Sequence, residues 1–311
     1  MKKIMVILFM GFIWSCSRQE DFILKEKDLI PEGTAFNTKT NTLYVGSIYK
    51  QKVVGIEADG TEKDIITKES FGVFSPLGME MDNRTNTLWV NGAVAPIVQH
   101  PPGTKRQTAV LAFNPTTNQL IKKMVLDIAE PAMLNDLSLD EEGNVYSTET
   151  LSHKIFWVER GSGKLVLYKA LDTYHHPNGI VFYKPKNSLF IATDEGIVQL
   201  ELESKKITLL EAKEGVDTRV IDGLTIYEDY FIGHQSIKVS KFYFDDDMTR
   251  ITKAETLDSG EAFDSSTTGE LGNGHYYYIV NSQLKSGIDR AIQSVKPLDS
   301  LEYVIIRRKK L

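Results

Sequence analysis

The chain has a single cysteine, Cys16, and lacks any apolar run long enough to span a bilayer. One cysteine cannot form a disulfide within the chain, so in an oxidising compartment the packed core alone must hold the fold. Basic residues form no cluster except the run at 307–310, which is typical of a solvated strand end, and the formal net charge is −6. An acidic chain of this kind argues against a nucleic-acid partner.

Familiar catalytic signatures are missing as well. The sequence holds no H-E-x-x-H, no G-x-S-x-G and no glycine-rich phosphate loop, which excludes three common classes of active-site motif. The acidic segment 242–250 lacks the glycine and distal glutamate of an EF-hand and resembles a hairpin turn. No stretch repeats apolar residues every 3.6 positions, so β-structure is the expected class.

The N-terminal residues predict a targeting segment. Two lysines precede an apolar run of about eleven residues, which is the length of a secretory signal. The run ends in "IWSC", which resembles the lipobox of bacterial lipoproteins, although Trp14 is unusual there. We therefore expect a lipoprotein signal peptide over 1–15, a lipidated Cys16 with a polar tether over 16–21, and a membrane-anchored protein of the cell envelope, periplasmic or surface-facing. A free thiol after an ordinary signal is the alternative.

The rest of the chain repeats a short strand start six times. The copies are "PEGTAF" at 31, "PLGMEM" at 76, "LNDLSL" at 134, "PNGIVF" at 177, "IDGLTI" at 221 and "TTGELG" at 267. Five copies carry glycine in the third place, and the copy at 134 carries Asp136 there. Successive starts are 43 to 58 residues apart, which is the length of one four-stranded unit.

Each start is followed by further strand patterns rich in aromatic and β-branched residues, such as "NTLWVNGAV" and "NSLFIATDE". Third strands are clear and fourth strands are weaker. This predicts an all-β fold, a six-bladed β-propeller over 22–311 with four antiparallel strands per blade. We also expect 21–26 to pair with the last strand of the chain and close the ring. A β-sandwich with a second domain is the alternative, but it does not predict six equivalent starts.

In a propeller, equivalent positions of the inner strands form a ring around one axis. The residues in the second place of the six starts are Glu32, Leu77, Asn135, Asn178, Asp222 and Thr268. Two carboxylates in one narrow channel repel each other unless a cation joins them. Carboxylate and amide oxygens without histidine or cysteine suit Ca²⁺, although another divalent cation would also fit.

We therefore predict a metal site made by Glu32, Asn135, Asn178 and Asp222. Any single Asn-Gly or Asp-Gly pair is more often a turn than a ligand. The ligand interpretation depends on four polar residues sharing one register of the repeat.

At these residues the chain resembles the senescence marker protein/gluconolactonase family of six-bladed propellers, which includes luciferin-regenerating enzyme and is related to paraoxonases. The resemblance extends over the mature chain, including "YYIVNSQL" in the last unit. It implies calcium at the four positions above and hydrolysis of lactones or related esters. Two family features are absent. Met133 stands where sugar-lactone members often have arginine, and Gly33 stands where paraoxonases have the aspartate of a second calcium.

A hydrolase of this kind needs a general base, and the sequence leaves it open. Asp222, Glu149 and His176 are the candidates, with His234 a weaker one. Asp136 is next to a predicted ligand, but an extended strand would turn its side chain to the opposite side.

Contacts to substrate are expected from Leu77, Met133 and Thr268 near the channel mouth, and the apolar pair favours a hydrophobic substrate. The expected function is a calcium-dependent lactonase or esterase that acts as a monomer on a small molecule. The alternative is a non-catalytic, ligand-binding propeller lipoprotein with a structural metal or none.

Overall fold

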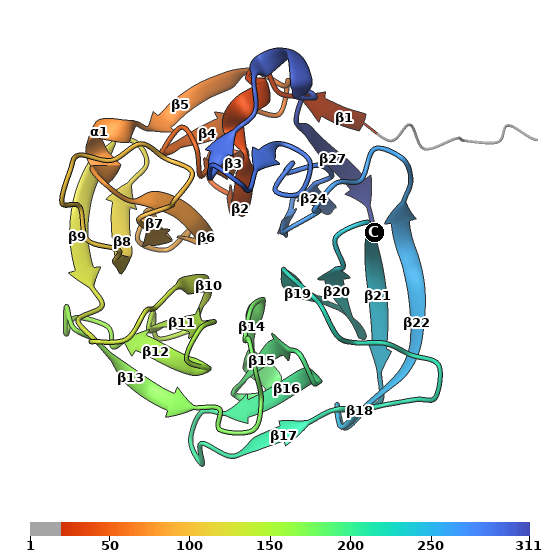
Figure 1. Cartoon of the computed structure of the whole chain (residues 1–311). Coiled ribbons are helices and arrows are strands. Elements are labelled where there is room, and N and C mark those ends of the chain that lie inside the picture. Colours follow the sequence, from red (N-terminus) through yellow and green to blue (C-terminus); the bar gives the residue numbers. More distant parts are fainter. Residues whose placement is uncertain (1–19) are drawn as a thin grey trace, which may run out of the picture.

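The computed structural model describes residues 20–311, which form six antiparallel sheets arranged as blades around a central channel (Figure 1). This confirms the predicted six-bladed β-propeller. The predicted signal peptide and Cys16 lie outside the described residues. No helix in the described part of the chain is long and apolar enough to cross a membrane.

The first three blades each consist of four consecutive strands. Blade 1 is β2 (Pro31–Asn37), β3 (Thr42–Ser47), β4 (Lys52–Ile56) and β5 (Glu62–Ile66). Blade 2 follows the short helix α1 (Lys68–Phe71) and is β6 (Ser75–Asp82), β7 (Thr87–Ala93), β8 (Thr108–Asn114) and β9 (Gln119–Val125). Blade 3 is β10 (Leu134–Leu139), β11 (Val145–Glu149), β12 (Lys154–Val158) and β13 (Leu165–Ala170).

A segment that follows blade 4 joins the outer edge of blade 5. Blade 4 is β14 (Ile180–Tyr183), β15 (Ser188–Thr193), β16 (Gly196–Glu201) and β17 (Ile207–Leu209). Blade 5 is β19 (Leu224–Tyr227), β20 (Tyr230–His234), β21 (Lys238–Phe244) and β22 (Arg250–Ser259). β18 (Glu211–Ala212) leaves blade 4 and pairs in parallel with β22, which gives blade 5 a fifth strand.

The sixth blade joins both ends of the described chain. It contains β23 (Gly269–Gly272), β24 (His275–Ile279), β27 (Ile305–Lys310) and, as its outer strand, β1 (Glu20–Ile23). β1 pairs antiparallel with β27, with Ile23 opposite Ile305. This confirms the expected closure. The connection between β24 and β27 carries a two-stranded hairpin, β25 (Ile288–Asp289) and β26 (Ser294–Val295), and a 3₁₀ turn, Leu298–Ser300. Two further 3₁₀ turns are Lys27–Leu29 and Lys184–Lys186.

Each inner strand begins at the same end of the channel, which we call the mouth. In blades 1, 2 and 3 the inner strand has a β-bulge at its start, between Pro31 and Thr34, Pro76 and Met79, and Leu134 and Leu137. A bulge re-aims side chains and bends the strand. At four of the six starts glycine is needed because backbone of the next blade lies in contact there. A Cβ on Gly179 would lie 2.5 Å from the backbone nitrogen of Leu224.

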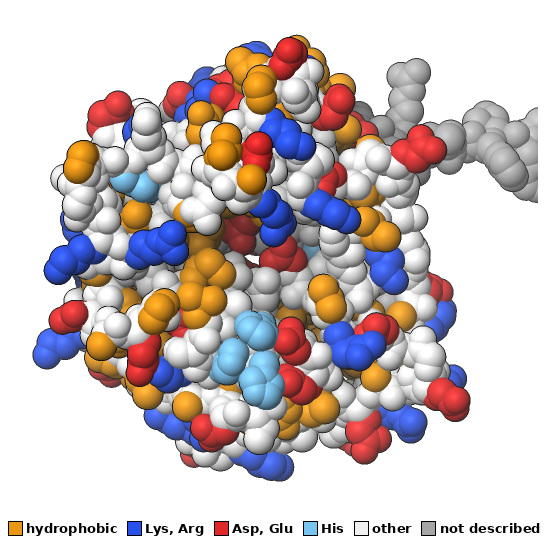
Figure 2. All heavy atoms as spheres, in the orientation of Figure 1, with side chains coloured by type: hydrophobic (Ala, Val, Ile, Leu, Met, Phe, Trp, Pro, Cys, Tyr) orange, Lys and Arg blue, Asp and Glu red, His pale blue; other side chains and the backbone are white. Residues whose placement is uncertain are grey.

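Two long connections border the mouth on one side. Residues 94–107 join β7 to β8, and residues 280–304 join β24 to β27. They bring Ala95, Val98 and Leu284 against Leu77 and Ile48 in one apolar cluster. Figure 2 shows the mouth face, with acidic side chains visible inside the central opening.

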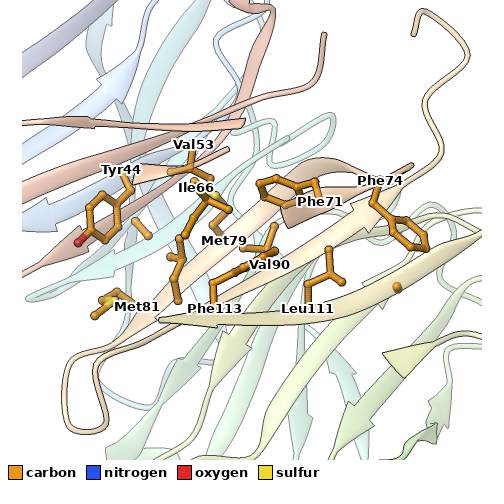
Figure 3. Close-up of a cluster of buried hydrophobic side chains, with 13 residues drawn as sticks. Tyr44, Val53, Ile66, Phe71, Phe74, Met79, Met81, Val90, Leu111 and Phe113 are labelled. Carbon is orange, nitrogen blue, oxygen red and sulfur yellow. The ribbon is translucent and has the colours of Figure 1, made fainter. Parts of the chain in front are cut away.

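The core is divided among the interfaces between neighbouring blades. Figure 3 shows the cluster between blades 1 and 2, where Tyr44, Val53 and Ile66 of blade 1 face Val90 and other apolar side chains of blade 2. These side chains are almost fully buried, and each contributes about 1.5–3 kcal/mol by leaving water. Wedged packing of this kind holds the inner strands, and therefore the ring of polar residues, at a fixed spacing.

Candidate metal centre

The four predicted ligands lie at the mouth ends of four blades. Glu32 and Asn135 are on the bulged starts of β2 and β10, and both are only 6% exposed. Asn178 and Asp222 lie two residues before β14 and β19, and the backbone nitrogen of each donates to the second strand of its blade, to Ala192 and His234 respectively. The four residues therefore lie at the starts of the inner strands of blades 1, 3, 4 and 5, at the same end of the channel.

The side-chain amides of the two asparagines are held through their nitrogen atoms. Asn178 Nδ2 donates to Asp222 Oδ1 over 2.7 Å, and Asn135 Nδ2 donates to Thr150 Oγ1 over 3.2 Å. Thr150 Oγ1 in turn donates to the carbonyl oxygen of Pro177. No described residue donates a hydrogen bond to Oδ1 of either asparagine. Both amide oxygens are thus left as acceptors, which is the orientation that a bound cation needs.

Glu32 provides the clearest sign of an incomplete site. Its Oε2 is buried and has no hydrogen-bond partner among the described residues. Burial raises the pKa of Glu32 well above its usual value, and the charges of Asp222 and Asp136 raise it further. Burial likewise raises the pKa of Asp222 to about 6, although the hydrogen bond from Asn178 works in the opposite direction. A buried carboxylate oxygen without a partner is costly unless a proton or a cation joins it.

These donors fit a hard divalent cation. Two carboxylates balance its charge, and two amide oxygens add ligands without further charge. Among residues 20–311, no group of three or more His, Cys, Asp or Glu side chains could hold a metal ion. The ring differs from such groups because half of its donors are amide oxygens.

Asp136 does not face away from the channel as the strand alternation predicts. The β-bulge between Leu134 and Leu137 breaks that alternation, and Asp136 lines a cavity of about 140 Å³ inside the channel. Its Oδ1 accepts a hydrogen bond from the backbone nitrogen of Leu137. Burial raises the pKa of Asp136 to about 7. The expectation was wrong because it assumed a regular strand.

Two further carboxylates line the same cavity and were not singled out from the sequence. Glu80 lies on β6 and Glu270 on β23, each shortly after its blade start. Burial raises the pKa of Glu270 to about 7, and burial together with the charge of Glu270 raises the pKa of Glu80 well above its usual value. The channel is therefore acidic along its length, which adds to the attraction for a cation at the mouth.

His176 shares a pocket of about 220 Å³ at the mouth with Asn178 and Asp222. Its Nδ1 is 2.7 Å from Oδ2 of Asp194, and its backbone nitrogen donates to Nδ1 of His153 over 3.0 Å. The residue has a left-handed backbone, with φ of 45°. Figure 2 shows the histidine side chains gathered beside the opening, next to acidic ones. Asp194, the first residue after β15, was missed because no local motif marks it.

His175, the preceding residue, forms a similar pair. Its Nδ1 is 2.6 Å from Oε1 of Glu195, and its ring packs edge-to-face against His153. His175 is not among the residues that line the pocket with Asp222. The two pairs therefore have the same chemistry but differ in their access to the ring.

The other two candidate bases are fully buried. Glu149 accepts hydrogen bonds from the backbone nitrogens of Met133, Leu151 and Ser152, and from the hydroxyl of Ser152. These contacts use both of its carboxylate oxygens to hold the turn before His153. His234 contacts Ser266 and Tyr276 through its two ring nitrogens, and burial lowers its pKa to about 3. Both geometries favour structural roles.

The predicted substrate contacts fall into two places. Leu77 and Met133 belong to the apolar cluster beside the mouth, where they form one wall. Thr268 lies deeper and lines the interior cavity. Its hydroxyl donates to the carbonyl oxygen of Glu32 over 2.6 Å, so it positions the start of β2.

Comparison with known proteins shows likeness at the level of structure. No protein-family model matches the sequence, and no curated protein matches it. Solved structures with the same fold include a gluconolactonase from Xanthomonas campestris (12% identity, 94% of this chain and 89% of that chain, TM-score 0.62). A luciferin-regenerating enzyme (12% identity, 94% and 96%, TM-score 0.63) is similar. A catalytically inactive virginiamycin B lyase from Staphylococcus aureus matches at 10% identity (94% and 99%, TM-score 0.61). The structural neighbours thus include gluconolactonase and luciferin-regenerating enzyme, the propellers to which the sequence was likened, and what the chain shares with them is the six-bladed fold.

Proposed function

We propose that the protein is a calcium-dependent hydrolase of a lactone or related ester. The observation that carries this proposal is the buried, unpartnered Oε2 of Glu32, found at the same end of the channel as two asparagines whose amide nitrogens are already bonded. Glu32, Asn135, Asn178 and Asp222 would hold the ion. A bound Ca²⁺ would act as a Lewis acid toward a carbonyl oxygen of the substrate.

His176 is the proposed general base. With Nδ1–H directed at Asp194, its Nε2 carries the lone pair that takes a proton from the attacking water. Asp194 fixes this tautomer and stabilises the imidazolium that forms. Asp222 is the second candidate from the sequence. Its hydrogen bond from Asn178 and its place in the ligand set make its carboxylate less available.

The substrate is proposed to carry an apolar substituent. Leu77 and Met133 form an apolar wall on one side of the mouth, where burial of each CH₂ contributes about 0.8 kcal/mol. We further propose that Cys16 anchors the protein to a membrane of the cell envelope, and that it acts as a monomer on a diffusing small molecule.

Hydrolysis of a panel of lactones and aryl esters, with and without a chelator, tests the proposal. Activity should require added calcium and should be abolished in Asp222→Ala. His176→Gln should lower kcat by about 10²–10⁴ while calorimetry shows calcium binding unchanged. His175→Gln is the matched control, because the His175–Glu195 pair lies outside the pocket, and it should retain activity. If calcium raises stability but the whole panel stays inert, the protein is a binding propeller with a structural metal.

A further inference from the structure

A second cleft lies between blades 3 and 4 on the face opposite the mouth. It is formed by the turns that follow β10, β12, β14 and β16, and its volume is about 590 Å³. This is within the usual range for small-molecule pockets, and it exceeds that of the cavity inside the channel. The proposed hydrolase chemistry uses none of its residues.

Aromatic side chains form much of this cleft. Tyr146, Trp157 and Tyr168 of blade 3 pack together, with ring centroids 5.1 to 5.8 Å apart, and Phe182 of blade 4 lies across from them. Trp157 and Phe182 are only partly buried. Exposed aromatic faces carry a negative quadrupole that attracts cations.

The charge in the cleft is predominantly negative. Five carboxylates and two lysines line it, and one lysine, Lys184, is already paired with Glu141 over 2.6 Å. Asp140 is only 7% exposed. Its carboxylate accepts hydrogen bonds from the backbone and side-chain nitrogens of Asn144 and from the hydroxyl of Tyr146, all neutral donors. No described lysine or arginine forms an ion pair with that carboxylate. A buried anion without a paired cation sits directly beside the aromatic cluster.

The chain itself places a cation on this aromatic surface. Lys205 Nζ lies 4.4 Å from the ring centroid of Tyr168 and donates to the carbonyl oxygen of Tyr168 over 3.4 Å. The side chain of Lys205 is exposed, and a lysine side chain loses much rotamer freedom when it is fixed in place. A ligand cation can therefore displace it. The geometry of this contact shows how an ammonium group would meet the aromatic face.

We propose that the cleft between blades 3 and 4 binds an organic cation, an ammonium group carrying an apolar body. The apolar body packs on Trp157 and Phe182, the ammonium takes the place of Lys205 Nζ over the ring of Tyr168, and Asp140 supplies the compensating charge. Neutral sugars also stack on aromatic side chains, but the excess of carboxylates and the position of Lys205 favour a cation.

Calorimetry and tryptophan fluorescence on the purified protein test this proposal. Benzyltrimethylammonium should bind with a submillimolar Kd, and choline should bind more weakly. 3,3-Dimethylbutan-1-ol, the uncharged isostere of choline, should bind at least tenfold more weakly than choline. Trp157 should report binding by a fluorescence change that is lost in Trp157→Phe, because Trp89 lies in blade 2 outside the cleft.

Three variants separate the proposal from a general effect on folding. Asp140→Asn keeps the size of the side chain, removes its charge and one of its two acceptor oxygens, and should weaken binding about tenfold. Asp82→Asn, at the equivalent position of blade 2 and equally buried, should leave Kd unchanged. Lys205→Met removes the internal cation and should tighten binding severalfold, which a purely structural role would not do. Absence of binding at 10 mM, equal affinity for the uncharged isostere, or preferential binding of glucose would each overturn the proposal.

Discussion

Replacing Glu32 with glutamine should make the metal-free protein more stable and should remove its response to calcium. The substitution keeps the size of the side chain and removes one of two charges that face each other in the ring. In the metal-free protein that charge destabilises the fold, because Oε2 of Glu32 is buried without a partner and the charge of Asp222 repels it. In the proposed calcium site, the same charge would be an essential ligand.

The magnitude follows from the unpartnered oxygen of Glu32. Leaving a buried polar atom without a hydrogen bond costs about 1–3 kcal/mol, and more when it is charged. Removing the charge should therefore recover about 2 kcal/mol, which is about 4 °C in Tm at ~2 °C per kcal/mol for a large domain. Calcium at about a hundred times its Kd should stabilise the unmodified protein by about 2.7 kcal/mol and Glu32→Gln by almost nothing.

Thermal and urea unfolding at pH 8, in chelator and in millimolar calcium, measure both effects. Glu80→Gln is the control, since Glu80 is a buried carboxylate of the interior cavity and not of the ring. It should also stabilise the metal-free protein but should keep the full calcium increment. A Glu32→Gln protein that is less stable without metal, or that keeps the increment, would refute the reasoning.

Two other predictions follow from the structure, and a third follows from the N-terminal sequence. Metal-free protein should be more stable at pH 5 than at pH 8 in urea unfolding. The folded-state pKa values of Asp136 and Glu270, both about 7, exceed their unfolded values, so stability is lost as pH rises from about 4 through 7. A flat profile would contradict this. Gly179→Ala should lower the free energy of unfolding by several kcal/mol, and therefore Tm, because its Cβ would lie 2.5 Å from backbone of blade 5; unchanged Tm would show that the blades can separate there. Cys16→Ala should abolish incorporation of labelled fatty acid and release the protein from membranes, as fractionation would show, whereas continued membrane association would exclude lipid attachment at this residue.

The repeated strand start was sufficient to predict the number of blades, because five of the six copies carry glycine and four of these glycines lie against backbone of the next blade. It also selected the four polar residues at the mouth, whose role as metal ligands stays a prediction. The pairing of β18 with the outer strand of blade 5 could not be predicted in the same way. Glu211 and Ala212 pair with β22 through backbone groups, and an exposed sheet edge accepts almost any sequence.

The parts of the site that escaped sequence analysis depend on local backbone geometry. Alternation along a strand assigned Asp136 to the wrong side, because nothing in "LNDLSL" marks the bulge that turns it into the channel. Asp194 reaches His176 only because the end of β15 lies beside the loop before β14. Such contacts join segments about twenty residues apart, and no sequence motif in either segment marks them.

The shared sixth blade determines when the ring can be completed during synthesis. Its outer strand comes from residues 20–23 and the strand beside it from residues 305–310. A growing chain therefore keeps an open sheet edge until residues 305–310 have left the ribosome, because β1 and β27 can pair only then. Contacts of such long sequence separation form slowly, so nascent and truncated chains should be the forms most exposed to proteases and to pairing with other chains.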